Sequence, residues 1–179
     1  DRYTLNLVKI VTKLLMDSNI ISETRVCGNL SIKSKNYLES QDGVKVLGKI
    51  NREQMPEIYA AADIYFSLDI NSACPNSVIE ALASGLPVVG FDTGALKELV
   101  TPEAGVIVPF GGNPWKLEEP AYKNIVDAVK KIIDDYVAES DEIVAKIIID
   151  KNSPFLRSLI VNKGSKNGTA GRHIPSMSK

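Results

Sequence analysis

The sequence predicts an α/β fold: a Rossmann-like parallel sheet with helices on both faces. Short apolar runs alternate with segments of helical periodicity along most of the chain, which is typical of parallel strands joined by crossover helices. The length of 179 residues, with 44% hydrophobic and 24% charged residues, is sufficient for one domain with a hydrophobic core. We expect residues 1–150 to form this domain and the basic residues 151–179 to form a flexible tail.

The apolar pattern gives the expected elements in chain order. Apolar side chains recurring every three to four residues predict helices at 3–17, 32–40, 52–62, 96–100, 125–136 and, last, 138–150. Short apolar runs predict strands at 24–27, 44–48, 63–68, 86–89 and 105–109. The loops after the second, third and fourth of these strands should share one edge of the sheet, where ligands of parallel sheets bind.

The stretch from Ser72 to Gly90 reads as a loop, a short helix and a buried strand. Pro75 suits the entry to a helix, Asn76 and Ser77 are candidate caps, and Gly85 is suited to the helix end. A helix entered from a tight loop presents free N–H groups and a positive dipole end. The stretch therefore suits an anion such as phosphate.

Glu80 lies about one turn into this helix. Helical side chains lean toward the N-terminus, so its carboxylate can reach back beside a ligand in the loop. Two interpretations of Ser77-x-x-Glu80 remain open. One is a capping box, in which the two side chains satisfy backbone groups of their own helix. The other is a site for a nucleoside diphosphate, with the phosphates at the helix tip and the ribose diol on the carboxylate.

The composition excludes several classes of function. A formal net charge of −1 argues against bulk electrostatic binding to nucleic acid or to an anionic membrane. Cys27 and Cys74 suggest neither a disulfide scaffold nor a zinc site, and a reducing cytoplasmic setting is expected. No apolar run is long enough to cross a bilayer. His173, in the tail, would lack the fixed geometry that catalysis needs.

The segment Cys74–Val89 closely resembles the donor site of retaining GT-B glycosyltransferases, the glycosyltransferase family 4-like group also called glycosyl transferases group 1. Segments 46–65, 92–100 and 104–109 extend the resemblance, which runs from about residue 3 to residue 136. In that family the second acid of a Glu-x7-Glu motif binds the ribose of the nucleotide sugar, and this role falls on Glu80. The first acid falls on Ser72, where a hydroxyl replaces a carboxylate.

The resemblance also implies the rest of the donor site. In the family, the backbone that lies against the nucleobase corresponds to Lys49 and Ile50 of this sequence. A lysine that binds the diphosphate in the family corresponds to Arg2. The alternative for Arg2 is a solvated charge at the chain terminus. No catalytic residue is assigned. The residues expected to bind the donor are Arg2, Lys49, Ile50, Ser72, Cys74, Pro75, Asn76, Ser77, Val78 and Glu80.

The implied activity is transfer of a sugar from a UDP- or GDP-sugar to an acceptor hydroxyl with retention, in polysaccharide biosynthesis and without metal or another cofactor. The family's N-terminal acceptor domain and the first strand of the donor domain have no counterpart here. We therefore expect a fragment that binds nucleotide weakly or not at all and transfers no sugar alone. Peripheral membrane association of the intact enzyme is compatible with the family.

Two other functions remain as alternatives. A non-catalytic nucleotide-sugar-binding or regulatory module of the same fold is favoured slightly by Ser72 and by the unusual tail. A sugar-nucleotide epimerase of the same fold group would need a histidine near the site, and His173 in the tail is the one histidine of the sequence.

Overall fold

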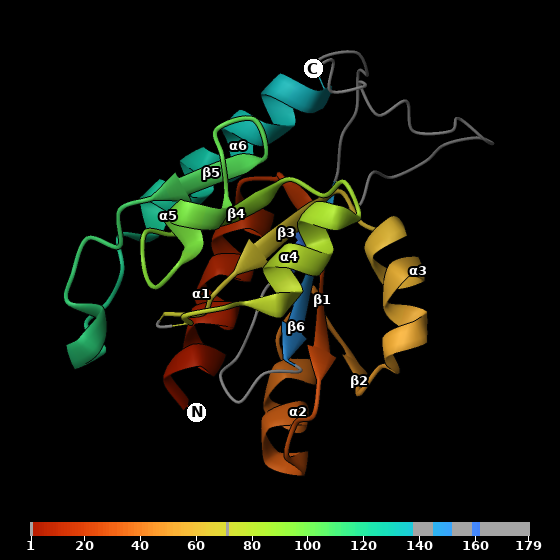
Figure 1. Ribbon diagram of the computed structural model, residues 1–179. Coiled ribbons are helices and arrows are strands. Elements are labelled where there is room, and N and C mark those ends of the chain that lie inside the picture. The colour runs from red at the N-terminus through yellow and green to blue at the C-terminus, as the bar shows by residue number, and fades with distance from the viewer. Residues whose placement is uncertain (1, 71, 138–144, 152–158, 162–179) are drawn as a thin grey trace.

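The computed structural model describes residues 2–70, 72–137, 145–151 and 159–161, and it confirms the α/β class (Figure 1). The helices are α1 (Arg2–Asp17), α2 (Ile32–Glu39), α3 (Met55–Ala60), α4 (Asn76–Ala83), α5 (Leu96–Leu99) and α6 (Tyr122–Val137), with short 3-10 turns η1 (Arg52–Gln54) and η2 (Pro114–Lys116). The strands are β1 (Ile21–Gly28), β2 (Val44–Gly48), β3 (Ile64–Ser67), β4 (Val88–Phe91), β5 (Gly105–Val108), β6 (Ala145–Lys151) and β7 (Leu159–Val161).

The strand order is β2-β1-β6-β3-β4-β5, and all neighbours in this path are parallel. β7 pairs antiparallel with β1 and β3. A doubly wound sheet normally has its first strand at the centre, where the order of strands reverses. Here β6, which comes from the C-terminal part of the chain, takes that central place between β1 and β3.

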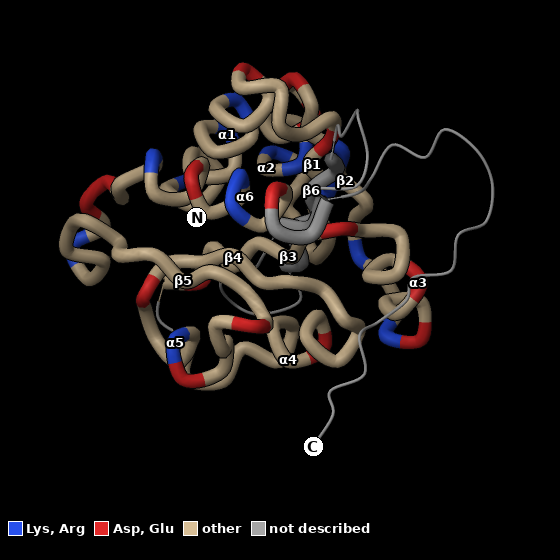
Figure 2. The backbone as a smooth tube through the Cα atoms, turned by 90° about the horizontal axis from the view of Figure 1, so that it is seen from above, with Lys and Arg blue, Asp and Glu red and all other residues tan. Residues whose placement is uncertain are grey.

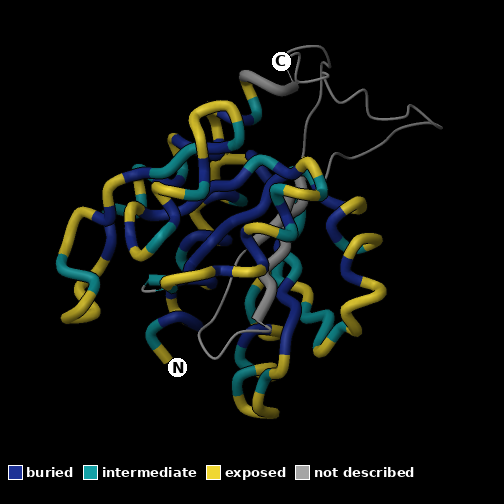
Figure 3. Tube along the Cα trace, in the orientation of Figure 1, coloured by how far each residue is buried: buried dark blue, intermediate teal, exposed yellow. Residues whose placement is uncertain are grey.

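Helices cover both faces of the sheet, and each face has its own core. Figure 2 shows α1 and α6 on one side of the strands and α4 and α5 on the other. The first core joins α1 and α6 to the sheet and includes Leu7, Val11, Phe66 and Ile125. The second core lies under α3, α4 and α5 and includes Tyr59. Both β3 and β4 are buried along their whole length (Figure 3), because helices cover them on both sides.

Most expected elements form within two or three residues of their predicted bounds, and two differ in kind. The expected helix over 138–150 is wrong where the structure describes it, because residues 145–151 form β6. Three consecutive isoleucines at 147–149 favour a strand. The expected helix over 52–62 begins as η1 and continues as α3, with Pro56 in its first turn. The predicted tail contains the last residue of β6, Lys151, and the whole of β7, and its other residues lie outside the described ranges.

We expect Ile148→Pro to destabilise the protein by about 3 kcal/mol or more, since proline removes a hydrogen-bond donor and fixes φ. Residue 148 pairs with Arg25 of β1 on one side and with Tyr65 of β3 on the other. Urea unfolding followed by far-UV circular dichroism measures the loss. Ile148→Val, which keeps the N–H and the β-branched shape, should stay close to the wild type. Equal midpoints for the two variants would show that β6 is not a central strand.

Candidate functional site

The polar loops predicted to share an edge do so. β2, β3 and β4 run parallel, so the segments that follow them all leave the carboxyl edge of the sheet. Residues 68–70 and 72–75 follow β3, which lies beside the position where the strand order reverses. Ligands of open parallel sheets bind in the crevice at this switch point. The fold thus places these residues, hereafter the β3–α4 loop, where a ligand is expected.

The β3–α4 loop is held by the segment that follows β4. The Thr93 hydroxyl donates a hydrogen bond to the carbonyl of Asp69 at 3.1 Å. The Ala95 N–H donates to the carbonyl of Ser72 at 3.0 Å. Gly94, with a φ of +57°, lies so close to Ser72 that a Cβ atom on it would be 2.5 Å from the Ser72 oxygen. These contacts fix the backbone of the loop just before helix α4.

Helix α4 begins with uncapped N–H groups. The structure makes Pro75 the N-cap, with no side-chain capping hydrogen bond, so the prediction that Asn76 and Ser77 cap the helix is wrong. The reason is that the two residues are the first two of the helix, one step beyond the capping position. Among the described residues, no acceptor lies within hydrogen-bond reach of the backbone N–H of Asn76 or Ser77. Two donors at the positive end of α4 therefore have no described acceptor, on the exposed Asn76 and on Ser77, which is 5% exposed.

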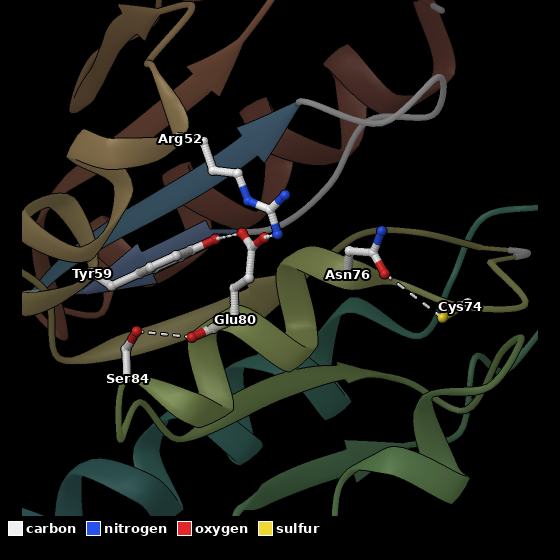
Figure 4. Close-up of polar contacts among 6 residues, drawn as sticks. All are labelled: Arg52, Tyr59, Cys74, Asn76, Glu80 and Ser84. Atoms are coloured by element: carbon white, nitrogen blue, oxygen red, sulfur yellow. Dashed lines mark hydrogen bonds and ion pairs between the residues drawn. The ribbon is translucent and has the colours of Figure 1, made fainter.

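The carboxylate of Glu80 has its described contacts with other elements and none with the N–H groups of its own helix start, so the capping-box interpretation is not realised. Its Oε2 accepts a hydrogen bond of 3.5 Å from the hydroxyl of Tyr59, on α3. Its Oε1 lies 3.6 Å from the Arg52 guanidinium, in η1. Figure 4 shows both side chains pointing at the carboxylate from the same side of α4. The Glu80 side chain remains 35% exposed, and a carboxylate has about four acceptor positions, so it can accept further hydrogen bonds.

The remaining residues predicted around the start of α4 differ in how far they are exposed to a ligand. Val78 is fully buried and its N–H donates to the Pro75 carbonyl at 2.9 Å, so it packs in the core and offers no donor to a ligand. Pro75 is also buried. Cys74 is exposed, and its thiol donates to the Asn76 side-chain oxygen at 3.7 Å.

The nucleobase and diphosphate candidates lie on the same edge of the sheet. Ile50 is half-buried against the second core, whereas Lys49 is exposed directly after β2. Arg2 is exposed in the first turn of α1. Because the C-terminal end of α1 leads into the start of β1, its first turn lies at the opposite end, toward the carboxyl edge of the sheet (Figure 1). No described contact ties Lys49 or Arg2 to Glu80.

The sequence prediction did not single out Tyr59 or Arg52. Both lie in the 46–65 segment that carries part of the family resemblance, but only Lys49 and Ile50 were given roles there. One signal was available for Tyr59, because a buried tyrosine hydroxyl needs a hydrogen-bond partner. For Arg52 we find no local signal, since its approach to Glu80 depends on how η1 and α4 pack.

The site as described has donors and acceptors but no cluster of metal-ligating side chains. Within the described ranges, no three His, Cys, Asp or Glu residues come together in a way that would hold a metal ion. Within the same ranges no helix has the length and apolar character to cross a bilayer. The arrangement can bind an anion through backbone N–H groups and hydroxyl groups through a carboxylate.

Comparisons with known proteins identify the family. The family model for Glycosyl transferases group 1 matches residues 6–135. A GDP-mannose-dependent alpha-mannosyltransferase of Mycobacterium tuberculosis (strain CDC 1551 / Oshkosh) is 37% identical over 60 residues, which are 33% of this chain and 16% of that protein. The crystal structure of AviGT4, a glycosyltransferase involved in avilamycin A biosynthesis, is 21% identical with a TM-score of 0.38, covering 64% of this chain and 42% of that one.

This chain therefore matches less than half the length of either of these proteins. The family model, in contrast, covers more than two thirds of the chain, including β1 to β5, the β3–α4 loop and Glu80. On that match, the chain belongs to the glycosyl transferases group 1 family.

Proposed function

We propose that this chain forms the donor-binding part of a retaining glycosyltransferase that moves a sugar from an NDP-sugar to an acceptor hydroxyl. Family membership supports sugar transfer. The observation that carries the assignment to a donor site is the position of Glu80. Its carboxylate is held by Tyr59 and Arg52, rather than by its own helix start, and it stays partly exposed.

In the proposed complex, the diphosphate lies against the start of α4. The open N–H groups of Asn76 and Ser77 donate to phosphate oxygens, and the helix dipole favours the negative charge. The same donors stabilise the charge that develops on the leaving diphosphate during transfer, because they are already oriented toward it. Glu80 accepts hydrogen bonds from the ribose diol. Ser72 supplies a hydroxyl near the sugar where the family has an acid.

The relative with a named donor is GDP-mannose-dependent, which supports GDP as the first nucleotide to test, with UDP as the comparison. We propose that the chain alone binds nucleotide with a dissociation constant on the order of 1 mM and transfers no sugar. An acceptor site would then have to come from protein beyond this chain.

Glu80→Ala should weaken GDP binding roughly 10- to 100-fold, since hydrogen bonds to a charged group contribute about 1.5–3 kcal/mol. Isothermal titration calorimetry at high protein concentration measures the dissociation constant. Glu98→Ala, which removes an exposed carboxylate from α5, is the matched control and should bind as the wild type does. If the dissociation constants of Glu80→Ala for GDP and for UDP equal those of the wild type, Glu80 does not hold the ribose and the proposal fails.

A non-catalytic binding module is the second candidate, and Ser72 in place of the family's first acid is the observation that favours it. Such a module would bind nucleotide through the same helix tip, so binding alone does not separate the candidates. Sequencing the gene upstream of the codon for Asp1 does. An open frame for a second Rossmann-like domain supports the enzyme, and a start codon immediately before Asp1 supports the module.

A further inference from the structure

The two oxygens of Glu80 have partners of very different character. Tyr59 is 1% exposed, and its ring packs beside that of Tyr65 with centroids 6.2 Å apart in the second core. The side chain of Arg52 is 87% exposed. A hydroxyl on a ring buried in the core has little freedom to move. A solvent-exposed guanidinium can leave its partner at little cost, because exposed ion pairs contribute only about 0–1 kcal/mol.

Both contacts to Glu80 are long. At 3.5 Å the Tyr59 hydrogen bond is well beyond the usual O–H···O range of about 2.5–3.0 Å. Hydrogen bonds that orient a functional group are often long in the unliganded protein and shorten when the ligand binds. Tyr59 therefore orients the carboxylate and still leaves it able to accept hydrogen bonds from a ligand.

We propose that Tyr59 is a positioning residue for the ribose: its hydroxyl orients Glu80 Oε2, so that Oε1 faces the diol, while Arg52 covers Oε1 only until the ligand replaces it. This inference rests on the proposed function, because it assigns a second residue to the same ribose site. It predicts that the hydroxyl of Tyr59 contributes to discrimination for the ribose diol and contributes little to the binding of the phosphates.

The test compares GDP with 2′,3′-dideoxy-GDP, which lacks the diol. The measured quantity is the ratio of the two dissociation constants. For the wild type we expect dideoxy-GDP to have a dissociation constant about 10 times that of GDP, which corresponds to the loss of one hydrogen bond to a charged group. For Tyr59→Phe the ratio should fall to about 3, with GDP binding weakened and dideoxy-GDP binding unchanged. For Arg52→Ala the ratio should stay at the wild-type value or rise, because the competing cation is gone.

Tyr65→Phe is the matched control. It removes a hydroxyl from a neighbouring buried tyrosine on β3, and its ratio should equal that of the wild type. A purely structural role for Tyr59 would weaken both ligands together and leave the ratio unchanged, which would overturn the inference. Glu80→Asp tests the ribose site itself. It withdraws the carboxylate from both Tyr59 and the diol by one methylene without touching the core, and it should also lower the ratio.

The inference and the proposed function fail in different ways. If Glu80→Ala keeps the wild-type ratio, the ribose does not lie on Glu80 and the proposed function fails. If Glu80→Ala brings the ratio to about 1 while Tyr59→Phe keeps it near 10, the donor site stands and only the role of Tyr59 is wrong.

Discussion

Gly105→Ala should destabilise the protein by more than about 4 kcal/mol, the range reached only by the most disruptive single substitutions. Gly105 starts β5 and pairs with Val88 of β4. A Cβ atom on it would overlap the carbonyl oxygen of Val88 and lie 2.8 Å from that residue's backbone carbon and nitrogen. Backbone atoms in a paired strand cannot move aside as a flexible side chain can, so the pairing of β4 with β5 has to break.

The control for this prediction is Gly90→Ala, in the middle of β4. There the nearest atoms to an added Cβ, including the carbonyl oxygen and Cβ of Ser67, are 3.3 Å away. We expect a change of about 1 kcal/mol. Urea unfolding monitored by circular dichroism gives both values. If Gly105→Ala unfolds at the midpoint of Gly90→Ala, then β5 does not pair with β4 in the register described.

Gly94→Ala should reduce nucleotide affinity at least tenfold, by displacing the β3–α4 loop. The φ of +57° at Gly94 costs an L-residue about 1–2 kcal/mol. The added Cβ would also lie 2.5 Å from the Ser72 oxygen and 2.9 Å from the Ser72 nitrogen. Ser72 has to shift, and the hydrogen bond that its carbonyl accepts from Ala95 is then strained or lost. Because this loop leads directly into α4, the open N–H groups move with it.

Gly111→Ala separates this effect from general destabilisation. Gly111 also has a positive φ, +86°, and an added Cβ would be 2.6 Å from the Ala121 Cβ, in the loop between β5 and α6. Both variants should unfold at lower urea concentrations than the wild type. Calorimetric titration with GDP, under conditions where each is folded, should show weaker binding only for Gly94→Ala. Equal loss of affinity in both variants would mean that Gly94 has no special connection to the site.

Local patterns predicted the elements because each one depends on its own residues. Val44–Gly48 was predicted with its observed bounds, and Gly85 takes a positive φ directly after α4 as expected. β6 was predicted as a helix because the segment before it resembles a helix and a short apolar run does not reveal its type by periodicity. Its central place between β1 and β3 depends on pairing with distant residues, which no local pattern contains.

The arrangement of the candidate site was predicted in part for the same reason. Glu80 and its helix were found because the loop, helix and strand that carry them are contiguous in sequence. Its partners were not, since Tyr59 and Arg52 are 21 and 28 residues away and reach it through the packing of α3 and η1 beside α4. The one-residue difference in the start of α4 also made Asn76 and Ser77 the first two residues of the helix instead of its caps.

The most direct test of the account is a titration of the ¹⁵N-labelled chain with GDP, followed by backbone amide chemical shifts. We predict that the largest shifts occur at the amides of Asn76 and Ser77, with smaller ones around Glu80 and Arg52 as their ion pair is replaced. Saturable shifts confined to other residues, with the first turn of α4 and Glu80 unaffected, would contradict it.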